Sequence, residues 1–229
     1  MIRYFVNVWK RYINPHLFSL IATVGVGGLV LCLLLSFLIV QLSEEVLEKE
    51  AFAFDKSFLL WLYQFANPTL DQIMISITQL GNTDVVIIVA VITFSLLWRK
   101  HYHQEAKLFL LACLGTLIIS TGMKVFFAKP RPQLWTHLIT TSSFSFPSGH
   151  ALVSIVLYGF IAYLVSSHYP KFSRLIYYFA AIIISLIGLS RLYLGVHWPT
   201  DIIAGYSVGF LWLMFCIVLL KLQNINRNS

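Results

Sequence analysis

The chain has few charged residues for its length. Only 11% of its 229 residues are Asp, Glu, Lys or Arg, whereas a typical soluble domain has about 25%. Hydrophobic residues make up 59%, and the mean hydropathy is +0.81. There is too little charge to cover a soluble core of this size. The composition argues against a soluble enzyme, a disordered chain and a collagen-like or disulfide-rich secreted module, and it predicts an all-α, polytopic membrane protein.

Cysteine is also scarce, and the three cysteines lie inside apolar runs. Cys32, Cys113 and Cys216 have no spacing typical of metal ligands. We interpret them as small buried hydrophobic residues that give no information about the redox compartment.

Long apolar runs dominate the sequence. The first, residues 17–43, is uncharged over 27 residues and shows no obvious small-x-small cleavage site. It is longer than the apolar region of a signal peptide, so we expect a retained first span. Together with five further runs it predicts one bundle of six transmembrane helices, without a second domain. The five runs are residues 85–98, 108–123, 151–167, 175–190 and 202–220.

Basic residues are unequally divided between the alternate loops of this bundle. Ten of the sixteen Lys and Arg residues lie on the side of the N-terminus, where Glu105 is the only one of nine acidic residues. Because basic residues accumulate in cytoplasmic loops, we expect a cell-membrane protein with both termini in the cytoplasm. The net charge of +7 then reflects topology in large part, and we expect no nucleic-acid partner.

An aromatic segment, residues 44–71, joins the first two predicted spans. Phe54, Phe58, Trp61 and Phe65 recur at spacings that place them on one face of a helix. The predicted fold includes this segment as an interfacial helix along the outer leaflet. A helix packed on the bundle fits the pattern equally, because amphipathicity does not distinguish protein from lipid as the apolar neighbour.

Three polar clusters interrupt the apolar sequence, all on the outer side of the predicted topology. In the first, Lys124 lies about one turn before the end of the third span. Pro130 and Pro132 are expected to stop the helix and fix the backbone that presents Arg131. Taken alone, these cations also fit a snorkelling lysine followed by a basic interfacial loop.

The second cluster, residues 146–150, precedes the fourth span. Ser148 is a plausible helix cap, and Gly149 would let the backbone approach a ligand. Free N–H groups at a helix start bind anions, and His150 would lie beside any such anion. A capped helix with an interfacial histidine is the alternative.

The third cluster begins at Arg191 and continues with residues 197–201. Pro199 is suited to be the first helical residue of the sixth span, which places Asp201 in the first turn and His197 just before it. The carboxylate could accept a hydrogen bond from one imidazole nitrogen and leave the other free as a nucleophile. A pair that merely caps a membrane helix is less favoured, because ionisable groups in membranes are costly.

These clusters are expected to meet at the outer ends of the third to sixth spans. The resulting pocket would hold three cations, two histidines and one carboxylate, which suits a phosphate dianion and its transition state. A zinc site made of His150, His197 and Asp201 is the competing interpretation. The cations would repel a divalent metal and no His-Glu-x-x-His motif occurs, so we expect no metal and no cofactor.

The order and spacing of the clusters resemble those of a known family. The sequence resembles the type 2 phosphatidic-acid phosphatase (lipid phosphate phosphatase) superfamily, which also includes the vanadium haloperoxidases. The signature region spans residues 124–201 of a single membrane-embedded domain, residues 1–229. Its three motifs are Lys124-x6-Arg131-Pro132, Pro147-Ser148-Gly149-His150 and Ser190-Arg191-x5-His197-x3-Asp201.

The resemblance implies a metal-independent membrane phosphatase that acts at the outer leaflet. His197 would form a phosphohistidine, Asp201 would orient it, and His150 would be the general acid and later the base. The phosphate ligands would be Lys124, Arg131, Arg191, Ser148 and Gly149.

Three substrates fit this resemblance: phosphatidic acid, phosphatidylglycerol phosphate and undecaprenyl pyrophosphate. Membrane lipids would be the other partners, and the oligomeric state is not predicted. A phosphotransferase, a haloperoxidase and a non-enzymatic lipid-headgroup binder or transporter are the alternative functions.

Overall fold

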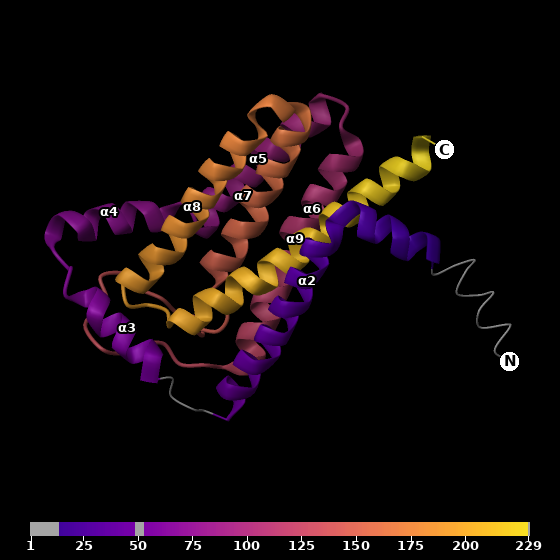
Figure 1. Ribbon diagram of the computed structural model, residues 1–229. Coiled ribbons are helices and arrows are strands. Elements are labelled where there is room, and N and C mark those ends of the chain that lie inside the picture. Colours follow the sequence, from indigo (N-terminus) through magenta and orange to yellow (C-terminus); the bar gives the residue numbers. More distant parts are fainter. Residues whose placement is uncertain (1–13, 49–52, 229) are drawn as a thin grey trace, which may run out of the picture.

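The structure is a computed structural model that describes residues 14–48 and 53–228, and within those residues it is helical without strands (Figure 1). A 3₁₀ turn, Pro170–Phe172, precedes α8. The helices are α2 (Asn14–Leu47), α3 (Ala53–Tyr63), α4 (Pro68–Gln79), α5 (Thr83–Arg99), α6 (His103–Phe127), α7 (Gly149–His168), α8 (Ser173–Tyr193) and α9 (Pro199–Asn228).

Five segments of the described chain are long and apolar enough to cross a membrane. They are Gly25–Leu47, His103–Phe127, Gly149–His168, Pro170–Tyr193 and Pro199–Gln223. Helices α4 and α5 meet at a bend of 43° and make a sixth candidate if they form one broken span. The protein is therefore a multi-pass, all-α membrane protein, as the composition predicts.

The second span differs from its prediction. The apolar run 85–98 lies within α5, but the sequence pattern does not indicate the preceding helix α4, whose apolar residues are interrupted by polar ones. Asn67 begins α4 by accepting a hydrogen bond from the Leu70 backbone N–H at 3.0 Å, and Pro68 occupies the first helical position. The bend between α4 and α5 places the 80–82 segment against α7, where the Tyr158 hydroxyl donates to the Leu80 carbonyl at 2.7 Å.

Helix α7 lies at the centre of the bundle and packs on α6, α8 and α9. The ring of Phe160 on α7 meets that of Phe109 on α6 edge to face, with centroids 5.7 Å apart. Both rings are buried, whereas Ile118 and Phe126 on α6 point outward and are about 70% exposed. Apolar side chains on that outer surface suit contact with lipid tails.

Two glycines allow α9 to approach α7 closely. A Cβ atom at Gly205 would lie 2.7 Å from the Ser148 carbonyl oxygen, and one at Gly209 would lie 2.9 Å from the Leu152 carbonyl oxygen. The small-x3-small spacing of this pair is typical of close helix packing in membranes. The contact joins the start of α7 to the start of α9, where the Ser148 N–H donates to the Asp201 carbonyl at 3.0 Å.

Replacing Gly205 with valine is expected to destabilise the protein, because the new side chain must displace backbone atoms of α7. Overpacking of this kind typically costs about 1–3 kcal/mol. The measurement is the thermal unfolding midpoint in detergent. Gly122→Val is the matched control, because a Cβ atom at Gly122 meets nothing within 4 Å. Equal midpoints for the two variants would contradict this account of the α7–α9 contact.

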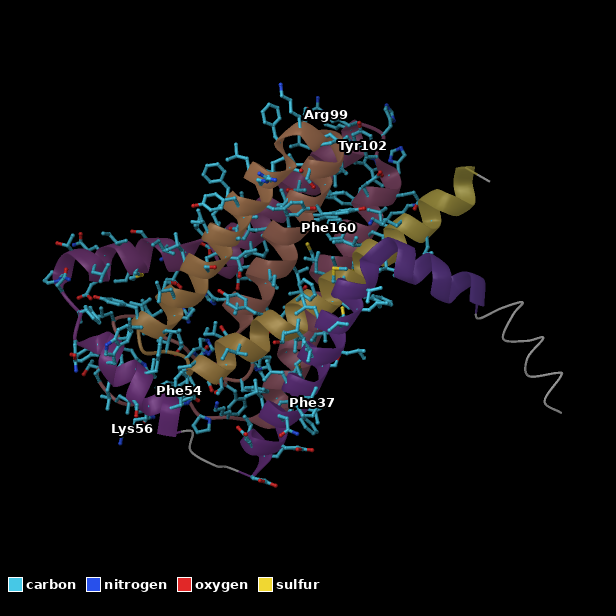
Figure 2. The ribbon with its side chains drawn as sticks, in the orientation of Figure 1. Phe37, Phe54, Lys56, Arg99, Tyr102 and Phe160 are labelled. Atoms are coloured by element: carbon cyan, nitrogen blue, oxygen red, sulfur yellow. The ribbon has the colours of Figure 1, made fainter. Side chains whose placement is uncertain are left out.

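Helix α3 lies at one end of the bundle. Figure 2 shows Phe54 and Lys56 of α3 at the opposite end from Arg99 and Tyr102. Helices α6 and α8 end, and α7 and α9 begin, on the side of α3 (Figure 1). All three sequence clusters therefore lie at this end.

The aromatic helix α3 packs on the bundle through α8 and α9. Leu59 and Asp55 are buried, whereas Phe54 and Trp61 are more than half exposed. The aromatic pattern predicts a helix through Phe65, but α3 ends at Tyr63; Phe65 still contacts Trp61, with ring centroids 5.2 Å apart. Packing on the bundle is thus confirmed, and an interfacial position of the exposed face stays a prediction.

Candidate active site

A buried histidine and aspartate lie at the start of α9. Pro199 is the first residue of α9, Asp201 lies in its first turn, and His197 precedes it. The His197 Nδ1 atom is 3.2 Å from Asp201 Oδ2, which also accepts from the Trp198 backbone N–H at 2.9 Å. Neither His197 nor Asp201 is more than 1% exposed. The four-residue spacing in the sequence therefore produces a fixed pair.

The neighbouring arginine identifies the tautomer of His197. The Nη1 atom of Arg131 lies 3.2 Å from His197 Nε2. Because a guanidinium can only donate, Nε2 is the acceptor and carries the lone pair. Nδ1 then carries the proton and donates a hydrogen bond to Asp201. Nε2 is thus the nitrogen available for a nucleophilic reaction.

Three nearby cations influence the protonation state of the His197 imidazole. Burial, followed by the positive charges of Arg191, Arg131 and Lys124, holds the pKa of His197 well below its ordinary value. His197 is therefore neutral near pH 7, as a nucleophile must be.

Lys124 and Arg131 share a partner in the loop that follows α6. Lys124, in the last turn of α6, donates to Ser143 Oγ at 2.9 Å. Arg131 donates through Nε to the Ser143 carbonyl at 2.8 Å and through Nη1 to the Val196 carbonyl at 2.6 Å. Helix α6 ends at Phe127 with Ala128 in the left-handed region, two residues before Pro130. The loop thereby holds the guanidinium beside His197.

Arg191 approaches the site from the last turn of α8. It is 3% exposed, and its Nη1 donates to Thr78 Oγ1 of α4 at 2.9 Å. Its Nε atom is buried and has no hydrogen-bond partner among the residues that the structure describes. Buried donors are normally satisfied, so an unsatisfied guanidinium N–H among other cations is suited to an oxyanion.

The start of α7 adds backbone N–H groups. Ser148 caps the helix by accepting from the Ala151 N–H at 3.4 Å, as its position predicts. A Cβ atom at Gly149 would lie 3.6 Å from Lys124 Nζ, so the first turn of α7 approaches that ammonium closely. Backbone N–H groups and the helix dipole favour an anion at this point.

His150 lies in the same turn and contacts the bend between α4 and α5. Its Nε2 is 2.8 Å from Asn82 Oδ1, while the Asn82 amide nitrogen donates to Gln79 Oε1 at 2.6 Å. This orientation makes Oδ1 an acceptor and Nε2 of His150 a donor. The same three cations, Arg191, Lys124 and Arg131, lie close enough to His150 to interact with it electrostatically.

The structure thus brings all eight residues singled out in the sequence to one end of the bundle. It also adds residues that the sequence did not single out. Lys129 and Thr200 occupy unspecified positions within the first and third motifs, and the other four belong to segments outside the motifs. Their only signal is polarity in an apolar chain. The added residues are Asp55, Thr78, Asn82, Lys129, Ser143 and Thr200.

The geometry offers no support for a zinc site. Among residues 14–48 and 53–228, no group of three or more His, Cys, Asp or Glu side chains is placed to hold a metal ion. His197 and Asp201 bond to each other, and His150 bonds to Asn82 instead.

The helices and this cluster define a multi-pass membrane protein with a cationic His–Asp site at one end of its bundle. The model of the PAP2 superfamily matches residues 105–225, which is more than half of the chain. The protein belongs to the PAP2 superfamily, and the family predicted from the three motifs is confirmed.

Characterised relatives are similar over most of their length. The chain is 34% identical to phosphatidylglycerophosphatase B of Bacillus subtilis over 147 residues, 63% of this chain and 72% of that protein. It is 32% identical to an undecaprenyl-diphosphatase of Sulfolobus acidocaldarius over 155 residues, 66% of this chain and 70% of that protein.

A solved structure has the same fold. The crystal structure of the transmembrane PAP2 type phosphatidylglycerolphosphate phosphatase from Bacillus subtilis superposes with a TM-score of 0.75 at 27% identity. The match covers 85% of this chain and 96% of that one.

Proposed function

We propose that the protein is an integral-membrane lipid phosphatase that hydrolyses a phosphomonoester or pyrophosphate of a lipid through a phosphohistidine on His197. One observation carries the proposal. The lone pair of His197 Nε2 faces Arg131, while Nδ1 is fixed by Asp201. Membership of the PAP2 superfamily and the phosphatase relatives support membrane lipid phosphate hydrolysis.

The first step is attack by His197 Nε2 on phosphorus. The bond between phosphorus and the lipid oxygen breaks and its electron pair goes to that oxygen. His150, whose imidazolium form is favoured by the negative charge of the bound phosphate, supplies the proton and becomes neutral. The side chains of Lys124, Arg131 and Arg191 bind the phosphoryl oxygens, whose charge is redistributed in the transition state. Ser148 and Gly149 add hydrogen bonds from the start of α7. Fixed cations in a buried site provide the stabilisation that such a transfer needs.

The second step hydrolyses the phosphohistidine. A water molecule attacks phosphorus and gives a proton to the neutral His150, while the bond between phosphorus and Nε2 breaks. Inorganic phosphate is released and both histidines return to their starting states. The proton that His150 gave to the lipid is thereby recovered.

The site lies on the extracytoplasmic side in this proposal, within one domain that includes residues 1–229. The excess of Lys and Arg in the segments on the N-terminal side supports cytoplasmic termini. Helix α3 lies at the end of the bundle opposite Arg99 (Figure 2). The names of the relatives favour a phosphatidylglycerol phosphate or a polyprenyl pyrophosphate as substrate.

A lipid panel assayed in EDTA tests the proposed function. The purified protein in detergent is expected to release phosphate from at least one lipid in a panel of phosphatidic acid, phosphatidylglycerol phosphate and undecaprenyl pyrophosphate. Activity should survive EDTA, because side-chain cations bind the phosphoryl group in the proposed mechanism. Failure with every lipid, or a loss in EDTA that added Mg²⁺ restores, would contradict the proposal.

A further inference from the structure

Helix α3 contains one carboxylate that is directed into the protein. Asp55 is 2% exposed, although the neighbouring Phe54 is 62% exposed. Burying a carboxylate is costly unless it is hydrogen-bonded or paired with a cation. The partners of Asp55 therefore indicate why it is there.

Asp55 caps α9 from another helix. Its Oδ1 accepts from the Thr200 backbone N–H at 3.1 Å, and its Oδ2 accepts from the Thr200 hydroxyl at 2.6 Å. Thr200 is the second residue of α9, where backbone N–H groups have no partner within the helix. A negative charge at this end is also favoured by the helix dipole. Asp55 thereby fixes the turn that carries Asp201.

Lys129 links this carboxylate to the catalytic pair. Its Nζ donates to Asp201 Oδ1 at 2.9 Å and to Thr200 Oγ1 at 3.0 Å, and it lies 4.0 Å from Asp55 Oδ2. The Thr200 hydroxyl donates a hydrogen bond to Asp55 and accepts one from Lys129. One ammonium thus bridges two carboxylates.

Both oxygens of Asp201 are consequently assigned. Oδ1 accepts from Lys129, and Oδ2 accepts from His197 Nδ1 and the Trp198 N–H. These contacts fix the rotation of the carboxylate about its side chain. The negative charge of Asp55 also offsets part of the positive charge that Lys129 places near His197, so that less of the stabilising effect of Asp201 is cancelled as His197 bonds to phosphorus.

We infer that Asp55 is a positioning residue for the His197–Asp201 pair, acting through Lys129 and Thr200. This inference rests on the proposed function. It gives α3 a role in catalysis that its aromatic face does not reveal, because α3 supplies the group that holds the start of α9 and the bridging ammonium in place.

The first test is Asp55→Asn, which keeps the size of the side chain and an oxygen for the Thr200 N–H but removes the charge. We expect kcat to fall about 10- to 100-fold, as for partners that orient a reactive ligand, with KM changed less than threefold, because the phosphate ligands are untouched. Glu44→Gln removes the same charge from an exposed position at the end of α2 and is expected to keep wild-type kcat. Unchanged kcat in folded Asp55→Asn protein would overturn the inference, even if its unfolding midpoint falls.

A double-mutant cycle tests the route through Lys129. If Asp55 acts through this ammonium, Asp55→Asn combined with Lys129→Met should have nearly the kcat of Lys129→Met alone. If the loss of kcat in the double variant equals the product of the losses in the two single variants, the two residues act independently and the inference is overturned. Where Asp55→Asn does not fold, Thr200→Val replaces it in the cycle with the same expectations, because it keeps the backbone N–H and removes the bridging hydroxyl. An inactive wild-type protein would instead overturn the proposed function and this inference together.

Discussion

Replacing His197 with alanine is expected to lower kcat for lipid phosphate hydrolysis by at least about 10⁴-fold, because the variant lacks the atom that bonds to phosphorus. His197 is buried but contributes little to the apolar core, so the variant should remain folded in detergent. The measurement is phosphate release from the best lipid of the panel, with size-exclusion chromatography as the check on folding.

His168→Ala is the matched control. His168 is exposed at the end of α7 remote from the site, and its replacement is expected to leave kcat within twofold of wild type. Substantial activity in folded His197→Ala protein would contradict the nucleophilic role, whatever the behaviour of the control.

Replacing His150 with alanine is expected to lower kcat/KM about 10²- to 10⁴-fold on a lipid or other alkyl phosphate, the usual contribution of general acid catalysis. An alkoxide leaving group needs a proton as the bond to phosphorus breaks, whereas p-nitrophenolate needs almost none. The loss should therefore be much smaller on p-nitrophenyl phosphate.

The two substrates separate acid catalysis from binding. Equal losses on the alkyl and the aryl phosphate would show that His150 contributes to binding or folding and not to protonation of the leaving group. In a single-turnover experiment, the aryl substrate should phosphorylate His150→Ala protein, and the phosphoenzyme should then be hydrolysed slowly. This result would agree with the second role of His150 as the base in hydrolysis.

Much of the fold follows from local sequence. The apolar runs predict the spans because a helix pairs its backbone N–H and C=O groups in its own hydrogen bonds, as the hydrocarbon interior of a membrane requires. Pro199 and Ser148 mark helix starts through chemistry within one turn. Helix α4 was not indicated because its polar residues interrupt the apolar run, and the bend after it depends on packing. The bend brings Gly81 so close to α7 that a Cβ atom there would lie 2.6 Å from the ring of His150. No local sequence pattern indicates this contact.

The candidate site could be predicted only where its residues follow a motif. His197 and Asp201 are four residues apart, so their contact is a property of one helix start. Asp55 meets Thr200 across 145 positions, and Asn82 meets His150 across 68. Such contacts depend on the packing of α3, α4 and α5 against the bundle, which no local pattern contains. The catalytic roles and the membrane side of the site stay predictions.

The shortage of charge in the sequence makes the remaining polar groups informative. Arg191 and Asp201 are buried in a chain with only 11% charged residues. Arg191 donates to Thr78, and Asp201 accepts from His197. The proposed function assigns three of the cations, Lys124, Arg131 and Arg191, to phosphate binding. Lys129 bridges Asp201 and Asp55.

Trapping the phosphoenzyme tests the central claim most directly. The protein is mixed with a ³²P-labelled substrate, quenched within the first turnover under alkaline conditions, and the labelled peptide is identified by mass spectrometry. The account predicts an acid-labile, alkali-stable phosphate on His197, absent from His197→Ala protein and longer-lived in His150→Ala protein. Turnover without a labelled protein, or a label on any other residue, would contradict it.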